Sequence, residues 1–399
     1  MTEEQEQLLR IRDLDLRFYT YEGVVKALDS VKLQVKDGET LGIVGETGCG
    51  KSVTGFSELN LIPPPGKIEG GKVLLFKDKQ WVNLLRQRDA YLRSVRGNDI
   101  SMIFQDPKSA LNPVYTVRRQ ISEAILHHRK EELCSNMLEE SKRATETLKQ
   151  GNLSEKERAA LMKTVLTKRE ERLLRRFQED SDGITVRIAS KIPVLKRFKQ
   201  KFDEEVRREV VRMLKDMRIP DPDRVAEMYP HELSGGMAQR AVIAMGLSCN
   251  PKLLIADEPT TNLDVTVQLQ ILTLIKDLKA KYGMTIQYIT HDMGVVAEMC
   301  DRVAVMYAGS VVELGEVKEI FKNPLHPYTK ALLECIPRPG REFKSIEGFV
   351  PSLINPPAGC RFNDRCPYAM DQCVSKKPEF LLVGKDHYVL CHLYTGESK

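Results

Sequence analysis

The stretch ETLGIVGETGCGKSVTGF, from Glu39 to Phe56, decides the fold of this 399-residue chain. Its apolar run at 40–44 is typical of a buried strand, the next six residues hold three glycines, and the residues after them favour a helix. Strand, glycine-rich turn and helix in this order are typical of a phosphate-binding P-loop. The pattern GxxxxGK[ST] is met by Gly45, Gly50, Lys51 and Ser52. The sequence therefore predicts a nucleotide site on an α/β fold.

A P-loop binds phosphate through its backbone. Glycines let successive N–H groups turn inward, and the helix that follows presents its positive end to the anion. We expect Lys51 to reach the β- and γ-phosphates and Ser52 to ligate magnesium. The predicted ATP contacts are Gly45, Glu46, Thr47, Gly48, Cys49, Gly50, Lys51, Ser52 and Val53.

A second apolar strand, KLLIADEP at 252–259, ends in two carboxylates, Asp257 and Glu258. In a parallel sheet this end of the strand lies at the carboxyl edge, where open α/β sheets bind their ligands. Asp257 suits a magnesium shell, and Glu258 suits a base that polarises the attacking water. A solvated acidic turn is the alternative interpretation, and the presence of the P-loop makes it the weaker one.

Between these motifs lies HELSGGMAQRAVIAMGL at 231–247, in which a Ser-Gly-Gly turn opens a helix and offers a further phosphate site at the helix N-terminus. LSGGM in this position resembles the signature of the ATP-binding cassette (ABC) ATPases. Three further residues are similar to motifs of that family, in the family's order: Gln105 in MIFQDP to the Q-loop, Asp264 in TTNLD to the D-loop, and His291 in YITHD to the switch histidine. The resemblance covers residues 8–320, apart from a long insert.

The resemblance implies that two such domains meet head to tail. Each ATP would lie between the P-loop of one subunit and the signature of the other, formed here by Ser234, Gly235, Gly236 and Met237. Catalysis would fall to Glu258, His291 and Gln105. Magnesium would be held by Ser52, Gln105 and Asp257. An aromatic residue before the P-loop stacks on adenine in this class, and Tyr21 and Tyr19 are the candidates, although both could equally be strand surface residues.

The implied fold is an α/β P-loop NTPase cassette: a RecA-like core with an antiparallel β subdomain and a helical subdomain, followed by a small irregular C-terminal metal-binding domain. We expect the core at 1–105 and 236–320. The helical signature subdomain would span 106–235, with a charged insert at about 131–200, and the C-terminal extension 321–399.

Several longer stretches resemble the D-type ATPase subunit of the oligopeptide/dipeptide importers. They are GETGCGKSVTGF, MYPHELSGGM, ADEPTTNLDVTVQ, THDMGVVAEMCDRVAVMYAG and NPLHPYTKALL. The resemblance implies an iron–sulfur cluster on a C-terminal cysteine motif. From the residues alone, four thiolates, those of Cys360, Cys366, Cys373 and Cys391, suit either a [4Fe–4S] cluster or zinc. The absence of a CxxC pair weakens zinc, a site without metal stays open, and disulfides would require an oxidising compartment.

The insert departs from the family. Ser154 and Glu157 form a capping box, and apolar residues at helical spacing predict one helix of about 25 residues that ends near Asp182. A second helix is expected from about Asp203 to Met217. The segment 118–215 carries a net charge of +8 against +5 for the whole chain. Nucleic acid or anionic lipid could explain this, but interspersed acids and few aromatics favour a solvated helical surface. We hypothesise that the insert adds contact with transmembrane subunits.

The sequence shows neither a signal peptide nor an apolar run long enough to span a membrane. The predicted function is that of an ATPase subunit that powers an ABC importer of oligopeptides or dipeptides, with oligosaccharides as an alternative cargo. The subunit is expected to be a peripheral protein at the cytoplasmic face of the cell membrane. Its expected partners are two transmembrane permease subunits, a second ABC ATPase (an F-type paralogue or a second copy) and an extracytoplasmic substrate-binding protein, with no nucleic acid. The alternative is a non-transport ABC ATPase acting on DNA or ribosomes.

Overall fold

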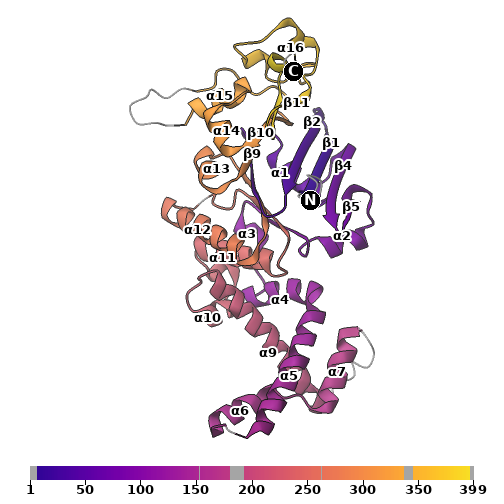
Figure 1. Ribbon diagram of the computed structural model, residues 1–399, viewed down its shortest axis with the longest axis vertical. Helices are drawn as coiled ribbons and strands as arrows, with labels where there is room; N and C mark the ends of the chain where they lie inside the picture. The colour runs from indigo at the N-terminus through magenta and orange to yellow at the C-terminus, as the bar shows by residue number, and fades with distance from the viewer. Residues whose placement is uncertain (1–6, 152, 180–192, 262, 337–344, 396–399) are drawn as a thin grey trace. The chain divides into compact units, whose positions relative to one another are not determined.

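The computed structural model describes residues 7–395, apart from 152, 180–192, 262 and 337–344 (Figure 1). The chain forms two compact units. The helical unit consists of residues 107–249, and the core unit joins the residues before 107 to those from 250 onward. All strands of the described residues belong to the core unit. Parts of the expected insert, at 152 and 180–192, lie outside the described residues.

An antiparallel sheet forms the first layer of the core unit. Its strands follow the order β2-β1-β4-β5 (Figure 1), with bounds Gln7–Thr20 for β1, Gly23–Lys36 for β2, Gly66–Lys77 for β4 and Gln80–Asn83 for β5. Leu9, Ile11 and Leu16 of β1 are buried, because this sheet packs on the core. Each of β1 and β2 is 14 residues long, and the two strands pair in antiparallel fashion.

A second, eight-stranded sheet carries the P-loop. Its order is β11-β12-β10-β9-β3-β8-β7-β6, and the five strands from β9 to β6 run parallel. The parallel strands are β3 (Thr40–Val44), β6 (Ile100–Ile103), β7 (Leu253–Asp257), β8 (Thr285–Thr290) and β9 (Arg302–Tyr307). Every residue of these five strands is buried, as expected of strands that are covered on both faces.

The helices of the core unit follow its strands. They are α1 (Lys51–Glu58), α2 (Asp89–Val95), α12 (Val265–Tyr282), α13 (Met293–Met299), α14 (Val317–Lys322), α15 (Pro327–Glu334) and α16 (Asp371–Ser375). Two apolar clusters stabilise this unit: one includes Leu9, Ile43 and Ile255, and the other includes Val44, Tyr328 and Phe362. Phe362 belongs to the C-terminal extension, which therefore contributes to the core.

The expectation of a separate irregular C-terminal domain is wrong in one respect. The extension adds β11 (Phe380–Gly384) and β12 (His387–Leu390) to the main sheet, because β12 pairs with β10 (Ser310–Glu316) in antiparallel fashion. A buried carboxylate reinforces the junction: Glu313 in β10 accepts hydrogen bonds from the Leu325 and His326 amides at 2.8 and 2.9 Å, and His387 Nε2 lies 2.8 Å from its Oε1. Proline-rich loops surround these strands, but the strands themselves complete the sheet.

The helical unit contains α3 (Pro107–Ala110), α4 (Val117–His128), α5 (Lys130–Gln150), α6 (Glu155–Thr164), α7 (Lys168–Glu179), α9 (Pro193–Asp216), α10 (Pro222–Glu227) and α11 (Gly235–Leu247). The LSGGM helix thus belongs to this unit, whereas the expected boundary fell at 235. A buried guanidinium links three of its segments: Arg129 donates to Glu132, Glu209 and the carbonyl of Ser248. The helix expected from Asp203 is longer at its start, since α9 begins at Pro193.

The single helix expected after Ser154 is instead two helices. The capping box of Ser154 and Glu157 is present, but α6 ends at Thr164. A second capping box, formed by Thr167 and Glu170, starts α7. The Thr167 amide donates to Glu170 Oε2 at 2.7 Å, and the Thr167 hydroxyl oxygen accepts from the Glu170 amide at 3.3 Å. The Leu166 amide, which a continuous helix would use internally, donates to Ser141 Oγ at 2.8 Å. The break therefore satisfies its own polar groups.

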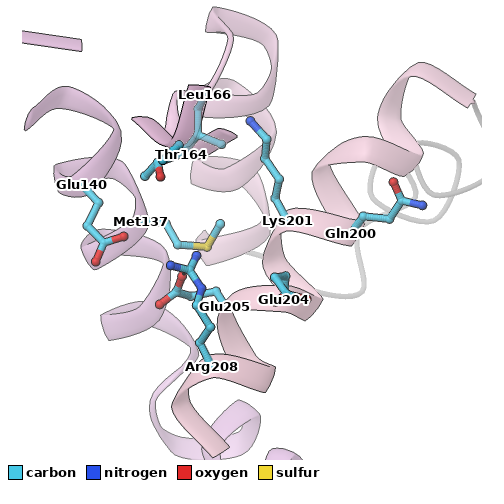
Figure 2. A pocket seen from close by; sticks show the side chains of 10 residues that line it. Met137, Glu140, Thr164, Leu166, Gln200, Lys201, Glu204, Glu205 and Arg208 are labelled. Atoms are coloured by element: carbon cyan, nitrogen blue, oxygen red, sulfur yellow. The ribbon is translucent and has the colours of Figure 1, made fainter. Parts of the chain in front are cut away.

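A cavity of about 540 Å³ lies among α5, α9 and the segment that joins α6 to α7 (Figure 2). Its lining includes Met137 and Glu140 from α5, Thr164 at the end of α6, Leu166 from the junction, and Lys201 and Arg208 from α9. Over the described residues, none of the helices has both the length and the apolar composition needed to cross a membrane.

Candidate functional site

The P-loop connects β3 to α1 in the core unit. Gly45 adopts φ 156°, and a Cβ there would lie 2.1 Å from the carbonyl oxygen of Met306, so no larger residue fits. Gly50 precedes α1 with φ 101°, in the left-handed region that favours glycine. The glycine pattern is therefore required by the backbone of the turn.

Lys51 lies inside this turn and is almost fully buried. Its ammonium group donates hydrogen bonds to the carbonyl oxygens of Gly45 at 2.8 Å and Glu46 at 3.2 Å. These bonds hold the cation at the loop, where an anion bound by the loop amides would meet it. Cys49 is also buried, and burial raises the pKa of its thiol to about 11, so this side chain serves packing.

The carboxylates at the end of β7 lie beside α1. Ser52 Oγ donates to Asp257 Oδ1 at 3.0 Å, which brings together the two side chains expected to ligate magnesium. Burial raises the pKa of Asp257 to about 6, although the Ser52 hydroxyl opposes the shift. A hydroxyl and a carboxylate are oxygen ligands of the kind that Mg²⁺ prefers, so the donor set fits the ion.

The carboxylate of Glu258 is contacted by side chains from three sequence motifs. Its Oε2 accepts hydrogen bonds from Gln105 Nε2 at 3.1 Å and from the Thr261 hydroxyl at 2.9 Å. His291 Nδ1 lies 3.0 Å from the other carboxylate oxygen, Oε1. Burial opposes ionisation of Glu258, but the contacts with His291 and Thr261 outweigh it and hold the pKa below its ordinary value. The group is therefore ionised at neutral pH, as a base that polarises water must be.

The backbone of Glu258 is strained. It adopts φ 44°, which is unusual for a residue other than glycine, and its amide donates to the Ile289 carbonyl in the neighbouring strand at 2.9 Å. Such strain is typical of functional positions whose surroundings fix the backbone. Thr261, which supports the carboxylate, was not identified from the sequence, although it lies in the TTNLD motif that supplied Asp264.

The remaining expected residues occupy helix starts. Asp264 caps α12, since its Oδ1 accepts from the Val267 amide at 3.0 Å. Ser234 caps α11 in the helical unit, where its hydroxyl oxygen accepts from the Met237 amide at 3.3 Å. The cap leaves Gly235 and Gly236 in the first turn of a 13-residue helix, with the amides that could meet an anion.

The two candidate aromatic residues differ in their surroundings. Tyr19 lies in β1, where its hydroxyl donates to Glu69 at 2.7 Å and the Lys67 ammonium lies 5.6 Å from its ring centroid. The hydrogen bond to Glu69 raises the pKa of Tyr19. Tyr21, in the turn between β1 and β2, is fully exposed. Tyr21 therefore presents a ring face to solvent, while Tyr19 is engaged within its sheet.

The four tail cysteines lie near one another. The Cys360 amide donates to the carbonyl of Cys373 at 2.7 Å, and burial together with the thiols of Cys391, Cys373 and Cys366 raises the pKa of Cys360 to about 11. All nine cysteines of the chain are free thiols. Within the described residues, however, no group of three or more His, Cys, Asp or Glu side chains is arranged to hold a metal ion. The metal site at these cysteines stays a prediction.

The P-loop, the paired carboxylates and the LSGGM helix define an ABC ATPase cassette. A family model for ABC transporters matches residues 28–261, and a model described as the oligopeptide/dipeptide transporter C-terminal region matches residues 312–373. The chain therefore belongs to the ABC transporter family, among the ATP-binding proteins with the oligopeptide/dipeptide type of tail.

Two peptide-transport ATP-binding proteins are similar to this chain over nearly its full length. The dipeptide transport ATP-binding protein DppD of Bacillus subtilis (strain 168) is 41% identical, covering 97% of this chain and 95% of its own. The oligopeptide transport ATP-binding protein OppD of the same organism is 40% identical, covering 96% of this chain and 88% of its own. The solved dimeric structure of MJ0796, a bacterial ABC transporter cassette, has a TM-score of 0.51 at 22% identity and covers 78% of this chain and 99% of that one. This likeness supports the cassette fold.

Proposed function

We propose that the chain hydrolyses ATP at the P-loop of its core unit and thereby powers the import of dipeptides or oligopeptides. The observation that carries the proposal is the convergence of Gln105, Thr261 and His291 on the carboxylate of Glu258, next to the Ser52–Asp257 pair. Relatives that share nearly the whole chain are dipeptide and oligopeptide transport ATP-binding proteins, which supports peptides as the cargo.

Each residue of the site has a proposed role. The P-loop residues 45–53, among them the Lys51 ammonium, bind the phosphates, and exposed Tyr21 stacks on adenine, with Tyr19 the second candidate. Ser52, Asp257 and Gln105 would hold magnesium, which when bound neutralises charge on the phosphates. Ionised Glu258 orients and polarises the attacking water, and His291, which is largely exposed beside it, contacts the γ-phosphate.

The site is completed by a partner. Ser234, Gly235, Gly236 and Met237 would bind the ATP of a second ABC ATPase subunit, and that subunit would return the same contact, with Asp264 at the junction. An F-type paralogue is the preferred partner, and a second copy of this chain is the alternative. Two transmembrane permease subunits and an extracytoplasmic substrate-binding protein complete the importer, which places the chain at the cytoplasmic face of the membrane. The oligopeptide/dipeptide tail and the peptide-transport relatives favour this assembly over partners such as DNA or ribosomes.

The four tail cysteines are proposed to hold a [4Fe–4S] cluster, with zinc as the alternative. Their soft sulfur donors suit either group and the thiols lie close enough to influence one another, although the described residues show no group of them arranged around a metal. Cys360, Cys366, Cys373 and Cys391 would be the ligands. When bound, the group would cross-link loops that have only a small apolar core of their own.

The test of the catalytic proposal is Glu258→Gln. This variant keeps the shape of the side chain but removes the charge and replaces one acceptor oxygen with an NH2 donor, so the hydrolysis rate is expected to fall by at least about 100-fold while ATP still binds. Phosphate release measures the first quantity, and fluorescence of a labelled nucleotide measures the second. In gel filtration with ATP, the variant should accumulate as a dimer, either with itself or with the paralogue.

The matched control is Glu298→Gln on α13, whose carboxylate pairs with Lys276 at 3.0 Å, away from the P-loop contacts described above. It should hydrolyse ATP like the unmodified chain. A Glu258→Gln variant that hydrolyses ATP at the normal rate would exclude Glu258 as the base.

A further inference from the structure

The second residue of the P-loop, Glu46, is held from three sides. Arg365 in the C-terminal extension forms a bidentate pair with its carboxylate, with Nη1 3.0 Å from Oε2 and Nη2 3.2 Å from Oε1. The Glu46 amide donates to the Tyr328 hydroxyl in α15 at 3.1 Å. Its carbonyl oxygen accepts from Lys51 Nζ at 3.2 Å. Glu46 therefore contacts both Lys51, the lysine proposed to bind phosphate, and Arg365 of the C-terminal extension.

Arg365 is itself fixed in place. Its side chain is 5% exposed, against 25% for that of Glu46. Its Nε donates to the carbonyl of Glu347 at 2.9 Å, and Nη1 also donates to the Tyr307 hydroxyl at 3.2 Å. Tyr307 packs against Tyr328 and Phe362, with ring centroids 4.6 and 5.1 Å apart. A guanidinium that is fixed in this way presents its two donors to Glu46 at a set position.

The segment that carries Arg365 also reaches the P-loop by a second route. Arg361, next to Cys360, donates to the carbonyl of Ala308 and pairs with Asp29 at 3.0 Å. The residue after Ala308, Gly309, donates a hydrogen bond from its amide to the carbonyl of Cys49 in the P-loop at 2.9 Å. The loop between Cys360 and Cys366 therefore contacts the segments around the P-loop through an arginine at each end.

We propose that Arg365 is a positioning residue for ATP binding: it fixes Glu46, and through Glu46 it sets the P-loop amides and Lys51 for the phosphates. This inference rests on the proposed placement of ATP at this loop. The proposal gives the C-terminal extension a role in nucleotide affinity, although Arg365 is 319 positions away from Glu46 in the chain. Because Arg365 makes no contact with Glu258 or His291 in the described contacts, affinity is expected to change more than the rate at saturating ATP.

The test compares nucleotide binding and hydrolysis in single and double variants. Arg365→Ala and Glu46→Gln should each weaken binding of a fluorescent ATP analogue by about five- to tenfold, as expected for loss of a charge-assisted pair. The double variant should be no weaker than the poorer single one, because both changes remove the same contact. KM for ATP should rise by a similar factor, while kcat stays within about twofold.

Three further variants make the result decisive. Arg365→Lys keeps the charge but loses the bidentate geometry, so it should fall between the unmodified chain and Arg365→Ala, and it serves if the alanine variant does not fold. Lys377→Ala removes an exposed lysine of the same extension that pairs with Asp29 at 2.7 Å, and this variant should bind the nucleotide normally. Lys51→Ala should abolish binding if ATP occupies the P-loop.

The outcomes separate the two proposals. Normal binding in Lys51→Ala would overturn the proposed placement of ATP. Loss of binding in Lys51→Ala with normal binding in both Arg365→Lys and Glu46→Gln would overturn only the role of Arg365. Additive losses of affinity in the double variant would show that Arg365 does not act through Glu46. A lowered thermal midpoint with unchanged affinity would make Arg365 a structural residue alone.

Discussion

Replacing Glu58 with glutamine is expected to stabilise the core unit at neutral pH and to leave its stability at acid pH nearly unchanged. Glu58 ends α1 and is completely buried. One carboxylate oxygen accepts a hydrogen bond from Gln287 Nε2 at 2.8 Å, and the other has no partner among the described residues. Burial raises the pKa of Glu58 from 4.5 to about 8, with Gln287 opposing the shift, so the folded chain holds this residue in its protonated form at neutral pH.

The size of the effect follows from the two pKa values. Between pH 4.5 and about 8, the folded chain keeps a proton that the unfolded chain has released, so the free energy of unfolding falls as pH rises. Each pH unit inside this window costs about 1.4 kcal/mol. From pH 5 to pH 7 the loss is about 2.5 kcal/mol once the partial titration at pH 5 is counted. Glutamine does not titrate, so the advantage of Glu58→Gln should grow by that amount over the same range.

Urea unfolding followed by tryptophan fluorescence measures this difference. The single tryptophan of the chain, Trp81 in β5, reports unfolding of the same unit. The control is Asp89→Asn, because a hydrogen bond from Arg93 lowers the pKa of Asp89 below 3.8, and its contribution therefore does not change between pH 5 and 8. A stability difference for Glu58→Gln that is the same at pH 5 and pH 7 would refute a protonated Glu58.

Two further predictions concern the tail and the insert. Anaerobically purified protein should absorb broadly in the visible range, with iron and sulfide in the ratio of a [4Fe–4S] cluster, and Cys366→Ser should lose both; a colourless protein with bound zinc would favour the alternative ligand, and one without metal would reject both. Removing residues 131–200 should weaken binding to the permease subunits in co-purification, and full binding and transport after the removal would exclude the proposed contact.

The sequence predicted the strands around the P-loop well because each is a short apolar run bounded by glycine or by charged residues. The strand at 40–44 and the carboxylates Asp257 and Glu258 were located for this reason. The break between α6 and α7 was missed because Leu166 and Leu173 keep helical spacing across it. The signal was nevertheless present, since Thr167 and Glu170 form the same type of capping box that identified Ser154.

Other features depend on contacts that sequence spacing does not reveal. β11 and β12 were missed because prolines dominate their surroundings, while the pairing that makes them strands comes from β10, far earlier in the chain. The pair between Glu46 and Arg365 likewise joins two segments whose proximity is set only by the folded sheet. Local patterns specify local structure, and tertiary contacts of this kind require the fold.

The junction of β10 and β12 limits how this cassette can be shortened or exchanged. A chain that ended after β10 would leave Glu313, which is completely buried, without its contact to His387, and would expose β10 as an unpaired edge strand that could pair with neighbouring molecules. Swapping the tail between related transporters would require matched residues at both strands. The cassette and its tail are therefore expected to be inherited as one unit, and engineering should treat them as one.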